Sequence, residues 1–383
     1  DVLGSRGLGD VYKRQVKAYV KEDYEKERFG KSNDDLVNTQ LNVLMIFSYM
    51  QPIMNIILNL SVVAVIKVGG IQVANGSVTP GNVMAAITYV TQSLNAVMRM
   101  TNMFQTASRG IASGRRINEV LACEPSIKDG SFNATTSIKG KIEFKNVTFA
   151  YPLTGDKKIL DNINLVIKPG ETIGILGETG CGKTSLINLI PRFYDVCEGS
   201  VLVDDIDVRE YNLKNLRERI SVALQKSEIF QSTIKENIQW GRENATNNDI
   251  ANAASIAQAM EFISTSTDGF DTLVTQQGTS LSGGQKQRIA ISRTILKQAE
   301  IIIFDDATSA LDLKTEANLY SMLKNAYPDT TKIIIAQRIA SVKDADRIVI
   351  LDDGHISAVG THEELLKNSA IYQDIYNSQL NKK

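Results

Sequence analysis

The chain has 383 residues, which is enough for two domains of ordinary size. Its net charge is −1, with 22% charged and 6% aromatic residues, so composition gives no reason to expect nucleic acid as a partner or a bulk attraction to anionic lipid. The three cysteines show neither metal-ligand spacing nor an even-numbered disulfide framework, which indicates a reducing, cytosolic setting for most of the chain.

The first residues do not resemble the start of a domain. The segment DVYKRQ, from Asp10 to Gln15, matches the in-frame translation of a sequencing-library transposon end, gat-gtg-tat-aag-aga-cag. We therefore interpret residues 1–15 as an assembly scar that is not part of the fold. The alternative is a genuine glycine-rich start. On the first interpretation the gene begins upstream and the chain is a fragment.

Two long stretches without a charged residue follow. Residues 16–35 are predicted to form a charged helix with i,i+4 pairs. Residues 36–66 and 68–98 then carry no charge, and each stretch exceeds the roughly 20 residues that span a bilayer. We predict two membrane helices, at about residues 42–66 and 82–103, joined by a short outside loop, GGIQVANGSVTPG. The second stretch contains Gln, Asn, Ser and Thr, so a soluble helix is the alternative for it.

Basic residues flank this pair of stretches on both sides. They are Lys21, Lys26, Arg28 and Lys31 before the pair, and Arg99, Arg109, Arg115 and Arg116 after it. Lys and Arg are in excess on the cytoplasmic side of membrane helices. Both ends of the pair are therefore expected in the cytoplasm, and the chain is predicted to be a multi-pass protein of the cell membrane.

The composition changes after Leu121. Residues 122–140 are polar and are predicted to be a linker. From Lys141 onward, short apolar strands alternate with helices, which is typical of an α/β domain. The sequence thus predicts a helical membrane region at residues 16–121 and a second domain at residues 141–383.

A phosphate-binding loop follows the predicted strand ETIGIL. The sequence GILGETGCGKTS has the spacing G-x-x-x-x-G-K-[ST] at Gly177, Gly180, Gly182, Lys183 and Thr184. Glycines let the backbone turn its N–H groups toward phosphates at the start of a helix. Lys183 is expected to bridge the β- and γ-phosphates, Thr184 to bind Mg²⁺, and the adjacent Ser185 to bind the nucleotide as well.

The stretch IIIFDDATSALD, residues 301–312, runs from four apolar residues into two carboxylates. A buried strand that ends in carboxylates is a common way to present Mg²⁺ beside a nucleotide. Asp305 is expected to hold the metal, and Asp306 is expected to polarise the attacking water.

A second helix start of anion-binding type lies about 100 residues after the first, in LSGGQKQR. It is opened by Ser282, Gly283, Gly284 and Gln285. One domain needs only one phosphate loop. The second start is therefore best explained if it covers the nucleotide of a partner domain.

With these motifs in this order, the chain resembles the ATP-binding-cassette (ABC) superfamily, and ABC exporters in particular. The resemblance covers roughly residues 16–378. It implies the last two of six all-α membrane helices, followed by a complete nucleotide-binding domain, an α/β P-loop ATPase with antiparallel β and helical subdomains. The first four helices would be missing. It also implies ATP and Mg²⁺ as cofactors, contact with membrane lipid, a second half-transporter as partner and an unidentified exported substrate.

The resemblance also implies roles for single residues. Tyr151 in FAYP matches the aromatic residue that stacks on adenine. Gln225 in ALQKSEIF matches the glutamine that senses Mg²⁺ and water. The resemblance therefore implies that Gln225 is both a metal ligand and a catalytic residue. Asp312 matches the acidic residue of the loop that contacts the partner domain.

The sequence departs from the family pattern at three positions. Asp306 stands where hydrolytic cassettes carry Glu, Gln337 stands where they carry the switch histidine, and Gln276 replaces a family Glu before LSGGQ. An Asp retracts the carboxylate by about 1.5 Å, and a displacement of about 1 Å can cost on the order of 100-fold in rate. Gln337 cannot carry the positive charge of a histidine.

These departures predict a cassette that binds ATP but hydrolyses it poorly. Its intact LSGGQ segment, the signature, would complete the ATP site of another chain. The chain would be the degenerate half of a heterodimeric exporter. Two alternatives remain. One is a homodimeric exporter that hydrolyses ATP slowly through Asp306, and the other is a soluble ABC ATPase, which the charge-free stretches disfavour.

Overall fold

The computed structural model describes residues 13–134, 139–152, 157–226, 228–275 and 278–380. The chain divides into two units, Asp1–Glu124 and Pro125–Lys383. The division falls inside the range 122–140 that was predicted as a linker. The later part of that range is not free, because Phe132 packs edge to face on Tyr211 with ring centroids 5.1 Å apart.

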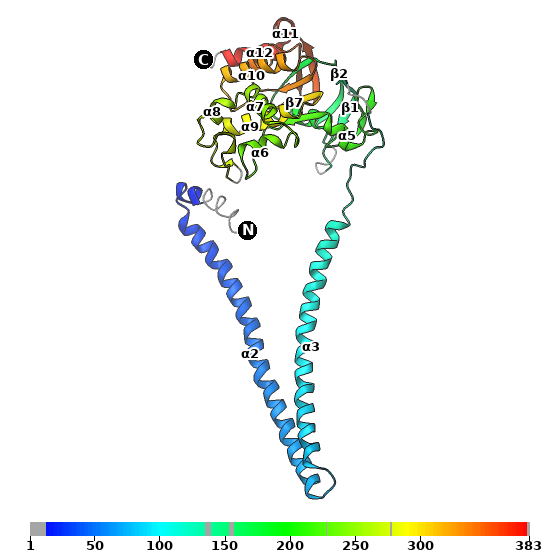
Figure 1. Cartoon of the computed structure of the whole chain (residues 1–383), viewed down its shortest axis with the longest axis vertical. Coiled ribbons are helices and arrows are strands. Elements are labelled where there is room, and N and C mark those ends of the chain that lie inside the picture. The colour runs from blue at the N-terminus through cyan, green and yellow to red at the C-terminus, as the bar shows by residue number, and fades with distance from the viewer. Residues whose placement is uncertain (1–12, 135–138, 153–156, 227, 276–277, 381–383) are drawn as a thin grey trace. The chain divides into compact units, whose positions relative to one another are not determined.

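The described part of the first unit is dominated by two long helices, α2 (Glu22–Ala74) and α3 (Pro80–Leu121), joined by a short turn (Figure 1). Both helices are longer than the predicted membrane spans, because the helical conformation continues from each apolar stretch into its charged flank. The prediction of one helix over residues 16–35 was wrong at one point. Val20 has a φ of 52°, and α2 begins only after it.

The loop between the two helices is shorter than predicted. Gly69 and Gly70 lie inside α2 instead of opening the loop, since a glycine costs a helix interior only about 1 kcal/mol. A Cβ atom built on Gly69 would lie 2.8 Å from Cγ2 of Val83 in α3, so this glycine allows the two helices to approach closely. By length and composition α2 could cross a membrane. No other described helix meets the same criteria of length, hydropathy and charge.

The second unit contains two sheets. The smaller sheet is antiparallel, in the order β2–β1–β4–β5, with β1 (Ile142–Phe149), β2 (Leu160–Ile167), β4 (Glu198–Val203) and β5 (Ile206–Asp207). The larger sheet has the order β10–β9–β3–β8–β7–β6 and is parallel except for β10. Its strands are β3 (Thr172–Leu176), β6 (Ile220–Ala223), β7 (Ile301–Asp305), β8 (Thr331–Ile335), β9 (Arg347–Asp352) and β10 (His355–Gly360).

The side chains of β7 show how the larger sheet separates two cores. Ile301 and Ile303 belong to the core shared with the antiparallel sheet, whereas Ile302 and Phe304 belong to the core covered by helices. All four side chains are fully buried. A strand buried on both faces is a continuous apolar run in the sequence, which is why this strand was recognisable in front of Asp305.

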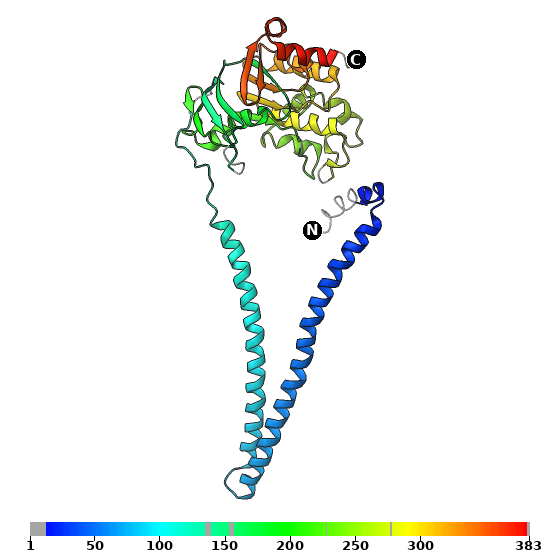
Figure 2. The same ribbon diagram turned by 180° about the vertical axis from the view of Figure 1, so that it is seen from behind.

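Helices pack around the larger sheet (Figure 2). They are α4 (Lys183–Asn188), α5 (Leu213–Glu218), α6 (Ile234–Gln239), α7 (Asn247–Ile256), α8 (Met260–Thr265), α9 (Gly283–Leu296), α10 (Leu313–Ala326), α11 (His362–Asn368) and α12 (Ala370–Leu380), with the 3-10 turns η1 (Gly269–Asp271) and η3 (Ile339–Ser341). Several start with a capping box, in which a Ser or Thr and the third helical residue satisfy each other's backbone N–H groups. These starts are at Thr233, Thr246, Ser282 and Thr361.

The strand order brings several functional segments to one edge of the larger sheet. Strand β8 lies between β3 and β7, and β6 pairs with the other side of β7. Asp305, the last residue of β7, is in register with Ile335, the last residue of β8. Ligands of open parallel sheets bind at the carboxyl ends of the strands. The segments that follow β3, β6, β7 and β8 therefore form the candidate site.

Candidate nucleotide-binding site

A pocket of about 260 Å³ lies at this edge. It is lined by Tyr151, Ile159, Thr179, Gly180, Gly182, Lys183, Thr184, Ser185, Gln225, Asp305, Asp306, Ile335 and Gln337. The structure thus brings together residues from five separate segments of the sequence. Sequence reasoning missed Ile159, Thr179 and Ile335. Thr179 lies inside the phosphate loop itself, whereas no local signal marked the two isoleucines.

The loop between β3 and α4 depends on its glycines. Gly180 and Gly182 have φ values of 92° and 105°, in the left-handed region that side chains disfavour. A Cβ atom on Gly177 would lie 2.1 Å from a backbone oxygen of β9. The ammonium of Lys183 donates to the carbonyl oxygens of Gly177 and Glu178, at 2.7 Å each. The backbone curve and the fixed cation suit the binding of phosphate oxygens.

Two oxygen atoms suited to Mg²⁺ lie side by side in the pocket. Thr184 Oγ1 donates to Asp305 Oδ1 at 3.0 Å. Asp305 is buried, and burial raises the pKa of its carboxyl group, with the Asp306 charge adding to the effect and the Thr184 hydrogen bond opposing it. Hydroxyl and carboxylate oxygens are the ligands that Mg²⁺ prefers. These residues therefore fit the metal predicted from the sequence.

The third predicted metal residue, Gln225, lines the same pocket and donates to the carboxylate of Asp306. Across the described residues there is no cluster of three or more His, Cys, Asp or Glu side chains that could hold a metal alone. A nucleotide site does not require such a cluster, because Mg²⁺ usually takes one or two protein ligands together with phosphates and water.

Asp306 connects the predicted catalytic residues. It follows β7 with a φ of 49°, and its backbone N–H donates to the carbonyl of Ile335 at 3.0 Å. Its Oδ2 atom accepts from Nε2 of Gln225 at 3.2 Å and from Nε2 of Gln337 at 2.8 Å. Burial raises the pKa of Asp306, while these two amides and the charge of Lys183 oppose the rise. One carboxylate oxygen thus joins all three residues.

Tyr151 contributes an aromatic wall to the pocket. Its ring packs edge to face on Phe149 and on Tyr194, with centroid distances of 4.9 Å and 5.0 Å. Its hydroxyl lies 2.9 Å from the Ser185 hydroxyl. Aromatic rings of this kind stack readily on nucleobases, and the two neighbouring rings fix the orientation of Tyr151.

The predicted signature residues lie apart from this pocket. Ser282 Oγ accepts from the N–H of Gln285 at 3.3 Å, and Gln285 Oε1 accepts from the N–H of Ser282 at 2.8 Å. Among the described residues, the lining of the pocket includes none of Gly177, Ser282, Gly283, Gly284, Gln285 and Asp312. Gly177 shapes the phosphate loop from behind, as described above. The remaining five residues lie outside the pocket, as expected for a signature segment that covers the nucleotide of a partner.

Asp312 has a structural task in addition to its predicted contact with a partner. It caps α10, because Oδ1 accepts from the N–H groups of Lys314 and Thr315 at 3.1 Å and 3.0 Å. Such a cap is typically worth about 1 kcal/mol. Gln276, the third departure from the family pattern, lies outside the described residues.

Gln287 links the signature helix to the segment after Asp306, and sequence reasoning missed it. Its Oε1 accepts from the N–H of Ala310 at 2.8 Å, and its Nε2 donates to Ser309 Oγ at 3.1 Å. Ser309 in turn donates to the carbonyl of Asp306 at 2.9 Å. Buried polar groups need partners. A second glutamine inside LSGGQKQR was the only available signal.

Comparisons with known proteins agree with this geometry. Residues 160–309 match the ABC transporter family, and residues 14–97 match the ABC transporter transmembrane region. The ATP-dependent lipid A-core flippase of Desulfotalea psychrophila is 40% identical over 367 residues, covering 96% of this chain and 64% of the relative. For the lipid A-core flippase of Syntrophus aciditrophicus the values are 37%, 96% and 61%. The structure of a bacterial Atm1-family ABC exporter with ATP bound matches with a TM-score of 0.87 and 28% identity, over 98% of this chain and 66% of that one.

The chain belongs to the ABC transporter family, in which it joins an ABC exporter transmembrane region to a mixed α/β ABC ATPase domain. The predicted fold class is confirmed, and so is the location in a membrane with a cytoplasmic ATPase domain. The chain spans 64% and 61% of the length of the two lipid A-core flippases that it matches. The activity, substrate and partner of the whole protein are therefore matters of proposal.

Proposed function

We propose that this chain is the ATP-binding and permease portion of an ABC exporter, and that it is the hydrolysis-impaired half of a heterodimer. Lys183, Thr184, Asp305 and Tyr151 would hold Mg-ATP, with Mg²⁺ neutralising phosphate charge. The partner half-transporter would supply the competent catalytic residues. Because two relatives are named lipid A-core flippases, an amphipathic, lipid-linked molecule is the first substrate to test.

The observation that carries this proposal is the pair of amides on Asp306 Oδ2. A carboxylate has about four acceptor positions, two on each oxygen. Gln225 and Gln337 use both positions on Oδ2, so an attacking water has only Oδ1. The Asp side chain is also about 1.5 Å shorter than Glu, and the neutral Gln337 supplies no positive charge. The groups that bind phosphate and metal are not affected by these changes.

One observation favours the second candidate, a homodimer that hydrolyses ATP slowly through Asp306. Burial raises the pKa of this carboxyl group. A carboxylate with a raised pKa is a better proton acceptor, as long as it stays ionised at the working pH. The two candidates therefore differ in how much turnover depends on Asp306.

Restoring the family residues tests the proposal. In the full-length transporter whose competent partner site is blocked by Ser282→Arg, the double substitution Asp306→Glu and Gln337→His should raise the remaining ATPase at least about 10-fold, because a positioned base typically contributes 100-fold or more. Adding Lys183→Ala to the restored protein should remove the gain, which shows that it arises at this site. A restored protein no faster than its parent would refute impaired hydrolysis through these two residues.

A further inference from the structure

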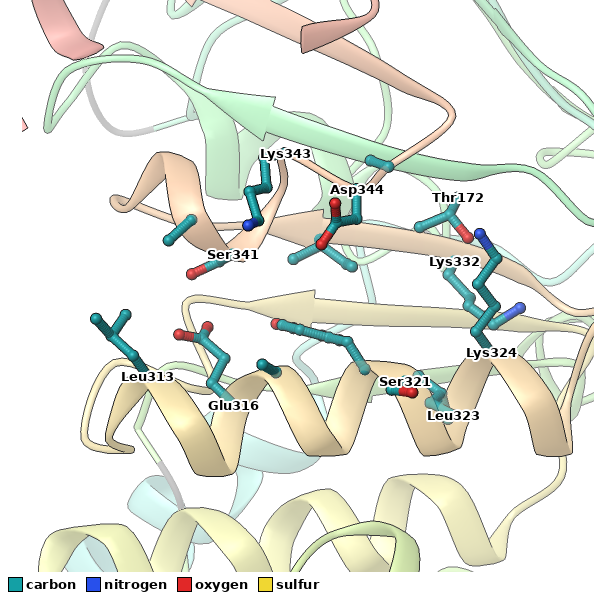
Figure 3. A pocket seen from close by; sticks show the side chains of 15 residues that line it. Thr172, Leu313, Glu316, Ser321, Leu323, Lys324, Lys332, Ser341, Lys343 and Asp344 are labelled. Atoms are coloured by element: carbon teal, nitrogen blue, oxygen red, sulfur yellow. The ribbon is translucent and has the colours of Figure 1, made fainter.

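The segment that carries Gln337 has a cavity on one side. After β8 the chain passes through Gln337 into η3, and a cavity of about 490 Å³ is lined by Ala340 and Ser341. In Figure 3, Leu313 and Glu316 of α10 face Ser341 across this space. Packing against α10 is therefore incomplete beside Ala340 and Ser341, whereas Ile339 and Val342 of the same segment are buried.

Gln379, near the end of α12, holds this segment with both ends of one carboxamide. Its Nε2 donates to the carbonyl oxygen of Gln337 at 2.8 Å, and its Oε1 accepts from the N–H of Ile339 at 2.9 Å. These two backbone groups flank Arg338, so the carboxamide spans the bend as a neighbouring strand would. A glutamine offers the donor and the acceptor that this bridge needs.

The two hydrogen bonds of Gln379 hold the backbone next to the contact between Gln337 and Asp306. Gln379 fixes the backbone of Gln337, while the side chain of the same residue donates to Asp306 at 2.8 Å. Small displacements at a reacting centre have large effects, on the order of 100-fold per 1 Å. We infer that Gln379 is a positioning residue, through which the C-terminal helix sets where the Gln337 carboxamide meets Asp306 and the terminal phosphate. The consequence for nucleotide rests on the proposed function, whereas the bridge does not.

Hydrogen exchange of the full chain without nucleotide tests the bridge. Gln379→Glu keeps the shape and the acceptor but loses the donor, and its carboxylate would face the carbonyl of Gln337. Gln373→Ala is the matched control, because Gln373 lies on the same helix and donates to Leu366 at 2.6 Å instead. Residues 336–342 should exchange about 10-fold faster in Gln379→Glu, and at the parent rate in the control. Equal exchange of this segment in both variants would overturn the inference.

A double-mutant cycle distinguishes positioning from general loosening. MANT-ATP and MANT-ADP are titrated into the full chain. Gln379→Glu should weaken MANT-ATP binding several-fold and leave MANT-ADP binding within about twofold, because only the terminal phosphate would face Gln337. In a Gln337→Ala background, Gln379→Glu should have no further effect.

Additive effects, or an equal loss for MANT-ADP, would overturn the positioning role. A parent chain that does not bind MANT-ATP would refute the proposed function instead. Hydrogen exchange would still decide whether Gln379 holds the segment.

Discussion

Lys183 is the residue on which nucleotide binding should depend most. Two loop carbonyls already hold its ammonium, so little reorganisation is needed to meet a phosphate. Lys183→Ala removes a charge-assisted contact and should weaken MANT-ATP binding about 10- to 100-fold. Lys214→Ala, which changes an exposed lysine of α5, should bind like the parent. Equal affinity of Lys183→Ala and the parent would contradict the assignment.

Glu171 and Arg347 give the second unit a pH-dependent stability. Burial alone would raise the pKa of Glu171, but the hydrogen bonds from Arg347 and from the N–H of Lys168 outweigh it and hold this pKa below its usual value. The folded pKa is therefore lower than the unfolded pKa of about 4.3. The contribution of this pair is present above the unfolded pKa, and it is lost as pH falls through the folded pKa.

Glu171→Gln should lower the free energy of unfolding at neutral pH by about 1–2 kcal/mol. It should also flatten the loss of stability between about pH 5 and pH 3. Trp240 is the single tryptophan of the chain and lies in the second unit, so its fluorescence can follow unfolding at each pH. A variant whose stability declines with acid as steeply as the parent's would show that this pair does not carry the effect.

At the scale of elements, the phosphate loop and β7 could be predicted because each has a strong local signal. Glycine spacing marks the loop, and a strand buried on both faces is a continuous apolar run. The contact of Gln225 and Gln337 with Asp306 could not be predicted, because it depends on the order of strands in the sheet. The break at Val20 and the continuation of α2 through Gly69 were missed for another reason. Composition alone does not determine where a long helix ends.

Gly69 and Gly70 offer a matched pair for testing the contact between α2 and α3. A Cβ atom on Gly69 would meet Val83 at 2.8 Å, whereas nothing lies within 4 Å of one on Gly70. Small residues allow close approach of membrane helices, and overpacking typically costs about 1–3 kcal/mol. Gly69→Leu should therefore lower the thermal stability of the detergent-solubilised protein, and Gly70→Leu should not. If both variants unfold at the parent temperature, α2 and α3 do not pack through Gly69.

At the scale of the whole molecule, the proposed function gives the chain two unlike surfaces that would contact ATP. The pocket at the sheet edge contains the residues proposed to bind phosphate and metal, together with Asp306 and Gln337 at the positions proposed for hydrolysis. The start of α9 at Ser282 is well formed and lies outside that pocket. In the proposed heterodimer, the pocket would bind ATP and turn it over slowly. The α9 start would complete the partner's competent site. A catalytic group matters only where the rest of the machinery is complete.

The most direct test compares Ser282→Arg with Asp306→Ala in the purified heterodimer at saturating ATP. Ser282→Arg places a bulky side chain at the α9 start, so it should block the partner's site and lower steady-state ATPase more than about 10-fold. Asp306→Ala should lower it less than about twofold, because its own site is already slow and its bound ATP mainly biases the conformation of the dimer. If Asp306→Ala is the more damaging substitution, this cassette is catalytic and the proposal of impaired hydrolysis is wrong.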